Sequence, residues 1–257
     1  MLALVASLVL TPLIRHFAIR AGCVDQPTSR KFHRTPVALL GGVALYVAFA
    51  LAVVITGAFE GPLRGVLLGA AFLMLVGLVD DTRGMNPSVK LLAQAGAASI
   101  AVLGGIQTTF LGAAYLNIPF TVLWIVGITN AFNLLDNMDG LAAGVAMISA
   151  STFAVLASRY STVGAEQVTT AVAAAALAGA CLGFLRYNVV RASVFMGDAG
   201  SMVLGFTLAS LAALGSWRSP TVPTSLLIPI LVLAYPIFDT TLVTLLRLQE
   251  GRPLFHG

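Results

Sequence analysis

The sequence predicts an all-α polytopic membrane protein. Of its 257 residues, 58% are hydrophobic and only 9% are charged, whereas charged residues make up about 25% of a soluble domain. The mean hydropathy is +0.96, and successive apolar segments have the length of a bilayer span. The short alternating strands of a membrane β-barrel are not seen in the sequence. We therefore expect one integral membrane domain over residues 1–257.

Nine apolar segments are expected to span the membrane as helices. They cover residues 2–14, 37–57, 65–79, 89–105, 119–131, 140–158, 168–185, 200–216 and 223–246. The first is short for a hydrocarbon core of about 30 Å. Between the fourth and the fifth, β-prone residues flank Gly112, which predicts a short hairpin on the membrane surface over residues 106–119.

The basic residues predict the orientation. Loops 15–36, 80–88, 132–139, 186–199 and 247–257 share one side of the membrane. With the start of the fourth segment, this side carries eleven of the 14 Lys and Arg residues, so the positive-inside rule makes it cytoplasmic. Most acidic residues fall on the same side, which the rule does not explain. Their clustering predicts a cytoplasmic site.

Two further properties of the composition limit the possible functions. The isoelectric point near 9.4 comes from basic residues beside membrane segments, a pattern that favours anionic lipid or phosphate over nucleic acid. The two cysteines, Cys23 in a basic loop and Cys181 in an apolar segment, give no disulfide framework.

Residues 130–140 carry the strongest polar signal. They contain two carboxylates and three carboxamides between two long apolar segments, and unpaired polar groups are costly in hydrocarbon. On a continuous helix Asn133, Asp136 and Asp139 would share an arc of about 120°. Gly140 and Gly144 would allow close approach of backbone or ligand. The segment predicts a binding site, with a polar seam between helices as the alternative.

Acidic residues also lie at the ends of two other segments. Asp80 and Asp81 end the third, where the helix dipole disfavours carboxylates. They are either solvated or compensated by a divalent cation, Arg83 or Lys90. Asp198 opens the eighth segment, as a helix N-cap or as the ligand of a phosphate-bound metal. Oxygen ligands without zinc-spaced His or Cys favour Mg²⁺.

The first cytoplasmic loop is basic. Residues 24–36 include Arg30, Lys31, His33 and Arg34. Such residues bind either anionic lipid headgroups or the phosphate esters of a substrate.

Taken together, these segments resemble the polyprenyl-phosphate N-acetylhexosamine-1-phosphate transferases, integral membrane enzymes that move a sugar-1-phosphate from a UDP-sugar to a polyprenyl phosphate. The resemblance runs from about residue 22 to the end, in four blocks at residues 25–33, 80–81, 130–141 and 195–201. Any one block is weak, but all four in order are specific. The resemblance implies ten spans, a bacterial-type cytoplasmic membrane location and a site on the cytoplasmic face.

The resemblance also implies roles for individual residues. Asp198 would bind Mg²⁺, or Mn²⁺ in its place, with Asn133 as a further ligand. Asp80 and Asp81 would act at the phosphate, one of them as base, ligand or nucleophile. The remaining residues would bind substrate, either the nucleotide sugar or its phosphates: Asn130, Asn133, Asp136, Asp139, Arg30, Lys31, His33, Arg252 and His256.

The implied reaction gives polyprenyl-diphosphate-GlcNAc and UMP, the first membrane step of an envelope polysaccharide such as teichoic acid or lipopolysaccharide O-antigen. UDP-MurNAc-pentapeptide is the alternative donor. In an ion-coupled transporter the acidic residues would lie near the membrane midplane. Nearly all the acids of this sequence lie at the ends of the apolar segments instead, and only Asp239 lies within one, which disfavours a transporter. A non-catalytic membrane subunit is the remaining alternative. The expected partners are the UDP-sugar, the lipid phosphate, the membrane and a second copy of the chain.

One departure from the family pattern concerns the end of the chain. The family continues into a His- and Arg-rich loop and a tenth span, whereas this sequence stops at Gly257. We therefore expect it to lack the last cytoplasmic loop and the last helix.

Overall fold

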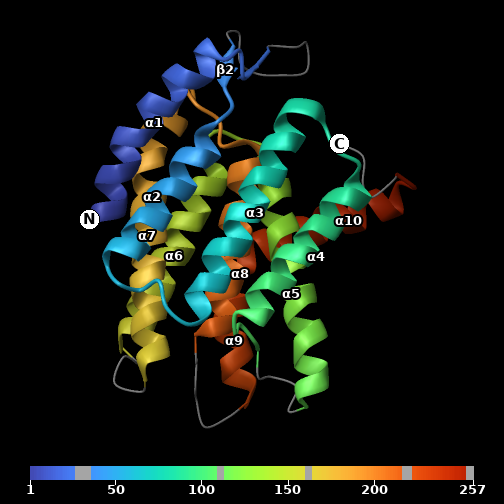
Figure 1. The fold of residues 1–257 in the computed structure, drawn as a ribbon. Helices are drawn as coiled ribbons and strands as arrows, with labels where there is room; N and C mark the ends of the chain where they lie inside the picture. Colours follow the sequence, from blue (N-terminus) through green and yellow to red (C-terminus); the bar gives the residue numbers. More distant parts are fainter. Residues whose placement is uncertain (27–35, 109–112, 160–163, 216–221, 253–257) are drawn as a thin grey trace.

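Ten α-helices and one two-stranded sheet make up the described part of the computed structural model (Figure 1), which covers residues 1–26, 36–108, 113–159, 164–215 and 222–252. The two strands, β1 (Val24–Asp25) and β2 (Val37–Ala38), pair antiparallel. The helices are α1 (Leu2–Arg20), α2 (Gly41–Ile55), α3 (Pro62–Arg83), α4 (Pro87–Leu103), α5 (Ala114–Leu135), α6 (Leu141–Arg159), α7 (Ala165–Asn188), α8 (Gly197–Leu214), α9 (Val222–Val232) and α10 (Ala234–Gln249).

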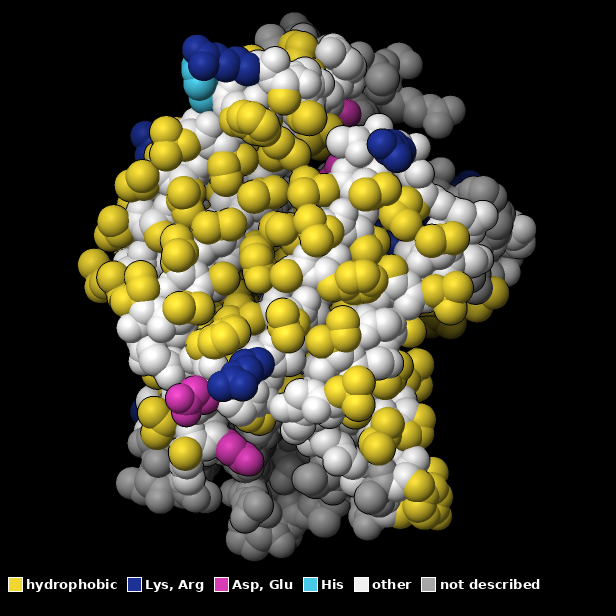
Figure 2. Space-filling model, viewed as in Figure 1, with side chains coloured by type: hydrophobic (Ala, Val, Ile, Leu, Met, Phe, Trp, Pro, Cys, Tyr) yellow, Lys and Arg dark blue, Asp and Glu magenta, His cyan; other side chains and the backbone are white. Residues whose placement is uncertain are grey.

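The helices confirm the prediction of an all-α membrane protein. Within the described residues, α1, α3, α5, α6, α7 and α8 are long and apolar enough to cross a membrane, while α2 and α4 are shorter apolar helices. Figure 2 shows a wide zone of hydrophobic side chains, with most of the charged side chains above and below it. This is the surface expected of a protein whose middle faces lipid.

The ninth predicted segment is not one continuous helix, because residues 223–246 form two helices that meet at Leu233. Pro236 has no backbone N–H to donate to the carbonyl of Val232, four residues earlier, and its ring clashes with that carbonyl. The Ser149 hydroxyl of α6 donates to the freed Val232 oxygen at 3.1 Å. Beyond the break α10 runs obliquely out of the bundle (Figure 1).

The hairpin predicted over residues 106–119 is wrong, because residues 114–119 belong to α5. Residues 109–112 lie outside the described residues. The backbone N–H of Thr108 donates to the Thr121 hydroxyl at 3.0 Å, and both side chains are buried. These tertiary contacts override the local β-propensity on which the prediction depended.

Helix α8 lies in the middle of the bundle, where every residue from 199 to 214 is buried. Its neighbours approach it through glycines. A Cβ at Gly77 of α3 would lie 2.3 Å from the Ala199 Cα, and one at Gly42 of α2 would lie 2.3 Å from the Gly200 backbone nitrogen. Small residues of this kind let membrane helices pack backbone to backbone. The first turn of α8 is therefore fixed between α2 and α3.

Candidate active site

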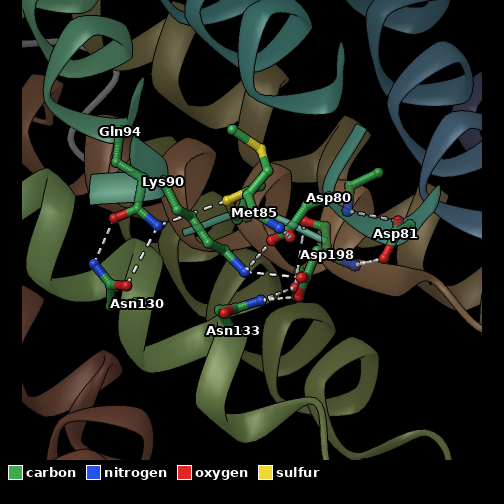
Figure 3. Close-up of polar contacts among 11 residues, drawn as sticks. Asp80, Asp81, Met85, Lys90, Gln94, Asn130, Asn133 and Asp198 are labelled. Atoms are coloured by element: carbon green, nitrogen blue, oxygen red, sulfur yellow. Dashed lines mark hydrogen bonds and ion pairs between the residues drawn. The ribbon is translucent and has the colours of Figure 1, made fainter. Parts of the chain in front are cut away.

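Lys90 is the centre of an acidic cluster formed by three helices (Figure 3). Its ammonium nitrogen lies 2.8 Å from Asp80 Oδ2 and 2.8 Å from Asp198 Oδ2. Asp80 comes from the last turn of α3, Lys90 from the first turn of α4 and Asp198 from the first turn of α8. The side chains of Lys90 and Asp80 are 15% and 10% exposed. The compensating cation predicted for Asp80 is thus Lys90, and Asp80 is not a solvated helix end. Arg83 is exposed.

The carboxylate of Asp81 points in a different direction from that of Asp80. It accepts the backbone N–H of Asp198 at 2.8 Å and that of Ala199 at 3.2 Å, whereas Asp80 accepts the Met85 N–H at 2.7 Å. Asp81 therefore caps the N-terminus of α8 from the neighbouring helix. Asp198 is not the N-cap, because it is the second residue of α8. Its carboxylate is left to face Lys90 and Asn133.

Asn133 and Asn130 have different partners. Asn133 donates its amide N–H groups to Asp198 Oδ1 and to the Ser201 hydroxyl at 3.0 Å, so it orients the Asp198 carboxylate. Asn130, one turn earlier on α5, exchanges hydrogen bonds with Gln94 of α4 and also donates to the Val126 carbonyl at 2.9 Å. In this structure Asn130 thus forms the polar seam between helices that was the alternative for this segment.

The predicted helical arc through Asn133, Asp136 and Asp139 is wrong, because α5 ends at Leu135 and Asp136 is its C-cap. The Gly140 N–H donates to the Asn188 side chain at 3.1 Å in the following turn, where Gly140 has φ +72°. Asp139 accepts the Ala192 N–H at 2.8 Å and so joins this turn to the loop before α8.

The two glycines after this segment differ. A Cβ at Gly140 would lie 2.6 Å from a Val189 methyl group, so this glycine is closely packed, but against a side chain and not against the backbone or ligand that was predicted. At Gly144 a Cβ would meet nothing within 4 Å, so no backbone approaches this glycine, and the approach of a ligand there stays a prediction.

Asp136 is half-buried near the other acids. Burial, reinforced by the negative charges of Asp198, Asp81 and Asp139, raises the pKa of Asp136 to about 7. Its carboxyl group can therefore exchange a proton near neutral pH.

The structure does not bring together all of the predicted basic residues. Arg30, Lys31, His33 and His256 lie outside the described residues. Arg252 is exposed and its guanidinium lies 3.0 Å from Glu250, not against the acidic cluster.

The β1–β2 pair is hydrogen-bonded to the residues that lead into α8. The Phe195 N–H donates to the Ala38 carbonyl at 2.8 Å, and the Gly41 N–H donates to the Phe195 carbonyl at 3.0 Å. The strand β2 is therefore held beside residues 194–196 of the loop that precedes α8.

Sequence reasoning gave too little weight to three residues. Lys90 was only one of several candidate cations, and Gln94 and Ser201 were not predicted to take part. Lys90 and Gln94 are four residues apart in an otherwise apolar helix, so they share one face of it. That spacing is the signal in the sequence that could have identified them.

The donor set is compatible with Mg²⁺. Among the described residues, no three or more His, Cys, Asp or Glu side chains form a group that could hold a metal ion. Mg²⁺, however, is usually held by one or two carboxylates together with substrate phosphates and water. Asp198 and Asp80, which contact the same ammonium group, meet that requirement.

Comparison with known proteins identifies the family. Residues 63–216, which include the whole acidic cluster, match glycosyl transferase family 4. The chain is 37% identical over 262 residues to a probable undecaprenyl-phosphate N-acetylglucosaminyl 1-phosphate transferase of Bacillus subtilis (strain 168), an alignment that covers 98% of this chain and 72% of the relative.

Two other relatives agree with this assignment. A decaprenyl-phosphate N-acetylglucosaminephosphotransferase of Mycolicibacterium smegmatis is 32% identical over 276 residues, which cover 94% of this chain and 68% of the relative. A phospho-N-acetylmuramoyl-pentapeptide-transferase of Heliobacterium modesticaldum is 37% identical over 196 residues, which cover 68% of this chain and 60% of the relative. The family resemblance seen in the sequence is confirmed: the chain belongs to glycosyl transferase family 4.

Proposed function

We propose that this protein transfers GlcNAc-1-phosphate from UDP-GlcNAc to a polyprenyl phosphate and releases UMP. The observation that carries the proposal is the Asp80–Lys90–Asp198 cluster at one end of an apolar helical bundle. A lipid phosphate anchored in the membrane and a water-soluble nucleotide sugar can meet only at such an end. The relatives that match 94% and 98% of the chain are named for this chemistry.

The reaction is a phosphoryl transfer between two anionic molecules. An oxygen of the lipid phosphate attacks the β-phosphorus of the UDP-sugar, and the bond from that phosphorus to the oxygen bridging it to the α-phosphorus breaks. The electron pair leaves with UMP. Positioning and electrostatic stabilisation supply most of the acceleration in such reactions. The lipid phosphate has a second pKa of about 6 to 7, as phosphate monoesters do, so a strong base is not required.

The residues of the cluster take separate parts in this reaction. Lys90 places a positive charge between Asp80 and Asp198, where it offsets negative charge brought by the phosphates. Asn133 fixes the orientation of Asp198. Asp198 and Asp80 would hold Mg²⁺, which when bound neutralises the diphosphate. Asp136 and Asp139 lie at the end of α5 and in the following turn, and we assign them to the nucleotide sugar.

The site is proposed to face the cytoplasm, in a bacterial-type cytoplasmic membrane. Arg20, Arg83, Arg186 and Arg191 lie at or beyond the helix ends on the side of the cluster, and Arg15 of α1 donates to the Ser193 carbonyl on the same side. Arg64 and Arg159 lie at the opposite ends of α3 and α6. The excess of arginine on the side of the cluster follows the positive-inside rule.

The test is UMP release by the purified protein. Because the chain spans 72% and 68% of its first two relatives, the protein is assayed at its full natural length, in detergent, with UDP-GlcNAc and undecaprenyl phosphate. We expect release that needs the lipid and Mg²⁺ and that Asp198→Asn abolishes. Glu60→Gln, at the opposite end of the bundle, is the matched control and should retain activity.

UDP-MurNAc-pentapeptide is the alternative donor, because a phospho-N-acetylmuramoyl-pentapeptide-transferase also matches this chain. Release from this donor and not from UDP-GlcNAc would change the proposed sugar. No release from either donor would contradict the transferase proposal.

A further inference from the structure

Of the adjacent acids Asp80 and Asp81, only Asp81 accepts hydrogen bonds from the backbone of another helix, α8. Its two carboxylate oxygens accept the N–H groups of Asp198 and Ala199 at 2.8 and 3.2 Å. The first N–H groups of a helix have no partner within the helix, so these two depend on Asp81. The contact joins the end of α3 to the start of α8 over 117 residues of sequence.

Two glycines make this contact possible. Gly197 has φ +66°, and a Cβ there would lie 2.4 Å from Asp81 Oδ2. Gly77 lies one helical turn before Asp81, and a Cβ there would lie 2.4 Å from the Ala199 backbone nitrogen. The backbones of α3 and α8 are therefore in direct contact at the point where Asp81 reaches across.

The same contact determines where the Asp198 carboxylate points. Its backbone N–H is held by Asp81 on one side, while its side chain is held by Lys90 and Asn133 on the other. If the first turn of α8 shifted or rotated, the carboxylate would move away from Asp80. Asp80 has no such contact with the α8 backbone, since its oxygens accept from Met85 and Lys90.

We infer that Asp81 is a positioning residue, which caps α8 and thereby holds Asp198 in the geometry needed for phosphoryl transfer. The two adjacent acids then have different tasks: Asp80 belongs to the charged cluster, and Asp81 acts through the backbone of Asp198. The inference rests on the proposed function only in so far as Asp198 serves that reaction. The cap itself can be tested without any activity.

Hydrogen exchange in the ligand-free protein tests the cap. Peptides spanning residues 195–203 report on the amides of Asp198 and Ala199. We expect these amides to exchange about tenfold faster in Asp81→Asn, because an amide replaces one acceptor oxygen by a donor. Gly197→Ala, which leaves every acid in place but displaces the Asp81 carboxylate, should do the same. Asp80→Asn should not change this exchange.

Gly22→Ala controls for backbone strain, since Gly22 has φ +72° and a Cβ there would meet nothing within 4 Å. It should leave exchange at residues 198–199 unchanged. Unchanged exchange in both Asp81→Asn and Gly197→Ala would overturn the inference. Should Asp81→Asn fail to fold, Gly197→Ala decides the question.

Kinetics separates positioning from direct chemistry. We expect kcat to fall more than about tenfold in Asp81→Asn and Gly197→Ala, with KM for both substrates changed less than about threefold. The pH profile of the residual activity should keep its wild-type shape, and the double variant should lose little more than either single one. A pH profile that loses a limb in Asp81→Asn alone would show that Asp81 itself titrates in the reaction, and would overturn the inference.

Failure of the proposed function would look different. If the wild-type protein released no UMP from either donor while the exchange results held, the cap would stand and the assigned reaction would fall. If the protein were active but residues 198–199 exchanged equally in all variants, the reaction would stand and the inference about Asp81 would fall.

Discussion

At the scale of single residues, Lys90 determines the net charge of the acidic cluster. Asp80 and Asp198 come from helices far apart in the sequence, and without Lys90 their carboxylates would repel each other in a poorly hydrated site. The lysine offsets one negative charge and leaves the pair with a net charge of −1. Such a site retains attraction for a cation while it tolerates the approach of phosphate.

Replacing Lys90 by Met should therefore damage both activity and stability. We expect UMP release to fall about 100-fold or more, as when a charge-stabilising donor is removed from an active site. Loss of one partner from a buried ion pair costs about 3–5 kcal/mol, and less here because the Asp198 side chain is 33% exposed. Thermal unfolding in detergent and UMP release are the measurements. Arg83→Met, an exposed change on α3, should behave like wild type, and equal effects of the two would refute the role of Lys90.

Asp136 gives a prediction for pH. Because its pKa is raised to about 7, the folded protein binds more protons than the unfolded chain between the ordinary carboxyl pKa of about 4 and pH 7. The contribution of protonated Asp136 to the free energy of unfolding is fully present below this pH range and is lost as the pH rises through it. Asp136→Asn, which cannot ionise, should not suffer this loss.

The measurement is the difference in Tm between Asp136→Asn and wild type in metal-free buffer. The difference should grow from pH 5 to pH 7 in favour of the variant and then level off. Asn137→Ala, a neighbouring exposed change without an ionisable group, should give a difference that does not vary with pH. A constant difference for Asp136→Asn as well would show that its carboxyl group ionises at ordinary pH.

At the scale of helices, the site depends on how closely α3 and α8 approach each other. Gly77 contributes no side chain to the cluster, yet it sets the separation of the two helices that carry Asp80, Asp81 and Asp198. The contact is made by backbone, so it does not show in the pattern of hydrophobic residues. A methyl group at this position has to push the two backbones apart.

Gly77→Ala should thus destabilise the protein by about 1–3 kcal/mol, the usual cost of overpacking, and should reduce UMP release. Gly127→Ala is the matched control, because Gly127 is exposed in the interior of α5 and a Cβ there would meet nothing within 4 Å. This control should be neutral or stabilising by about 0.5–1 kcal/mol. Unfolding by denaturant in mixed micelles is the measurement, and equal stability of the two variants would contradict the close packing of α3 and α8.

At the scale of the whole molecule, the alternating helices bring chain reversals at residues 84–86, 136–140 and 189–196 to the same end of the bundle. All the described acids of the cluster lie at these reversals or at the helix ends beside them. The opposite end carries Glu60, Arg64, Arg159 and Glu166. The distribution of arginines between the two ends predicts which end faces the cytoplasm.

Cysteine labelling tests this orientation. In a Cys23→Ser, Cys181→Ala background, Ser88→Cys marks the end with the cluster and Ser158→Cys marks the other, and both serines are exposed. A membrane-impermeant maleimide should label Ser158→Cys in intact cells, and Ser88→Cys only after the membrane is permeabilised. The reverse pattern would place the site on the outer face.

The sequence by itself determined the class of the protein, the family and the acidic residues of the cluster. Apolar composition, helix-length segments and polar residues at their ends are local properties, and each follows from the cost of unpaired polar groups in lipid. The sequence could not tell Asp80 from Asp81, identify Lys90 among the candidate cations or separate Asn130 from Asn133. Those differences depend on which way each side chain points.

Only the tertiary structure decided these assignments, because each depends on contacts between helices that are distant in the chain. Asp81 caps α8, Lys90 joins α3 to α8, and Asn130 pairs with Gln94. The boundaries that were wrongly predicted have the same cause. The break before α10 and the early start of α5 are stabilised by Ser149 and by Thr108, each supplied by another segment. Local propensity carries no information about such partners, since they become neighbours only when the bundle has packed.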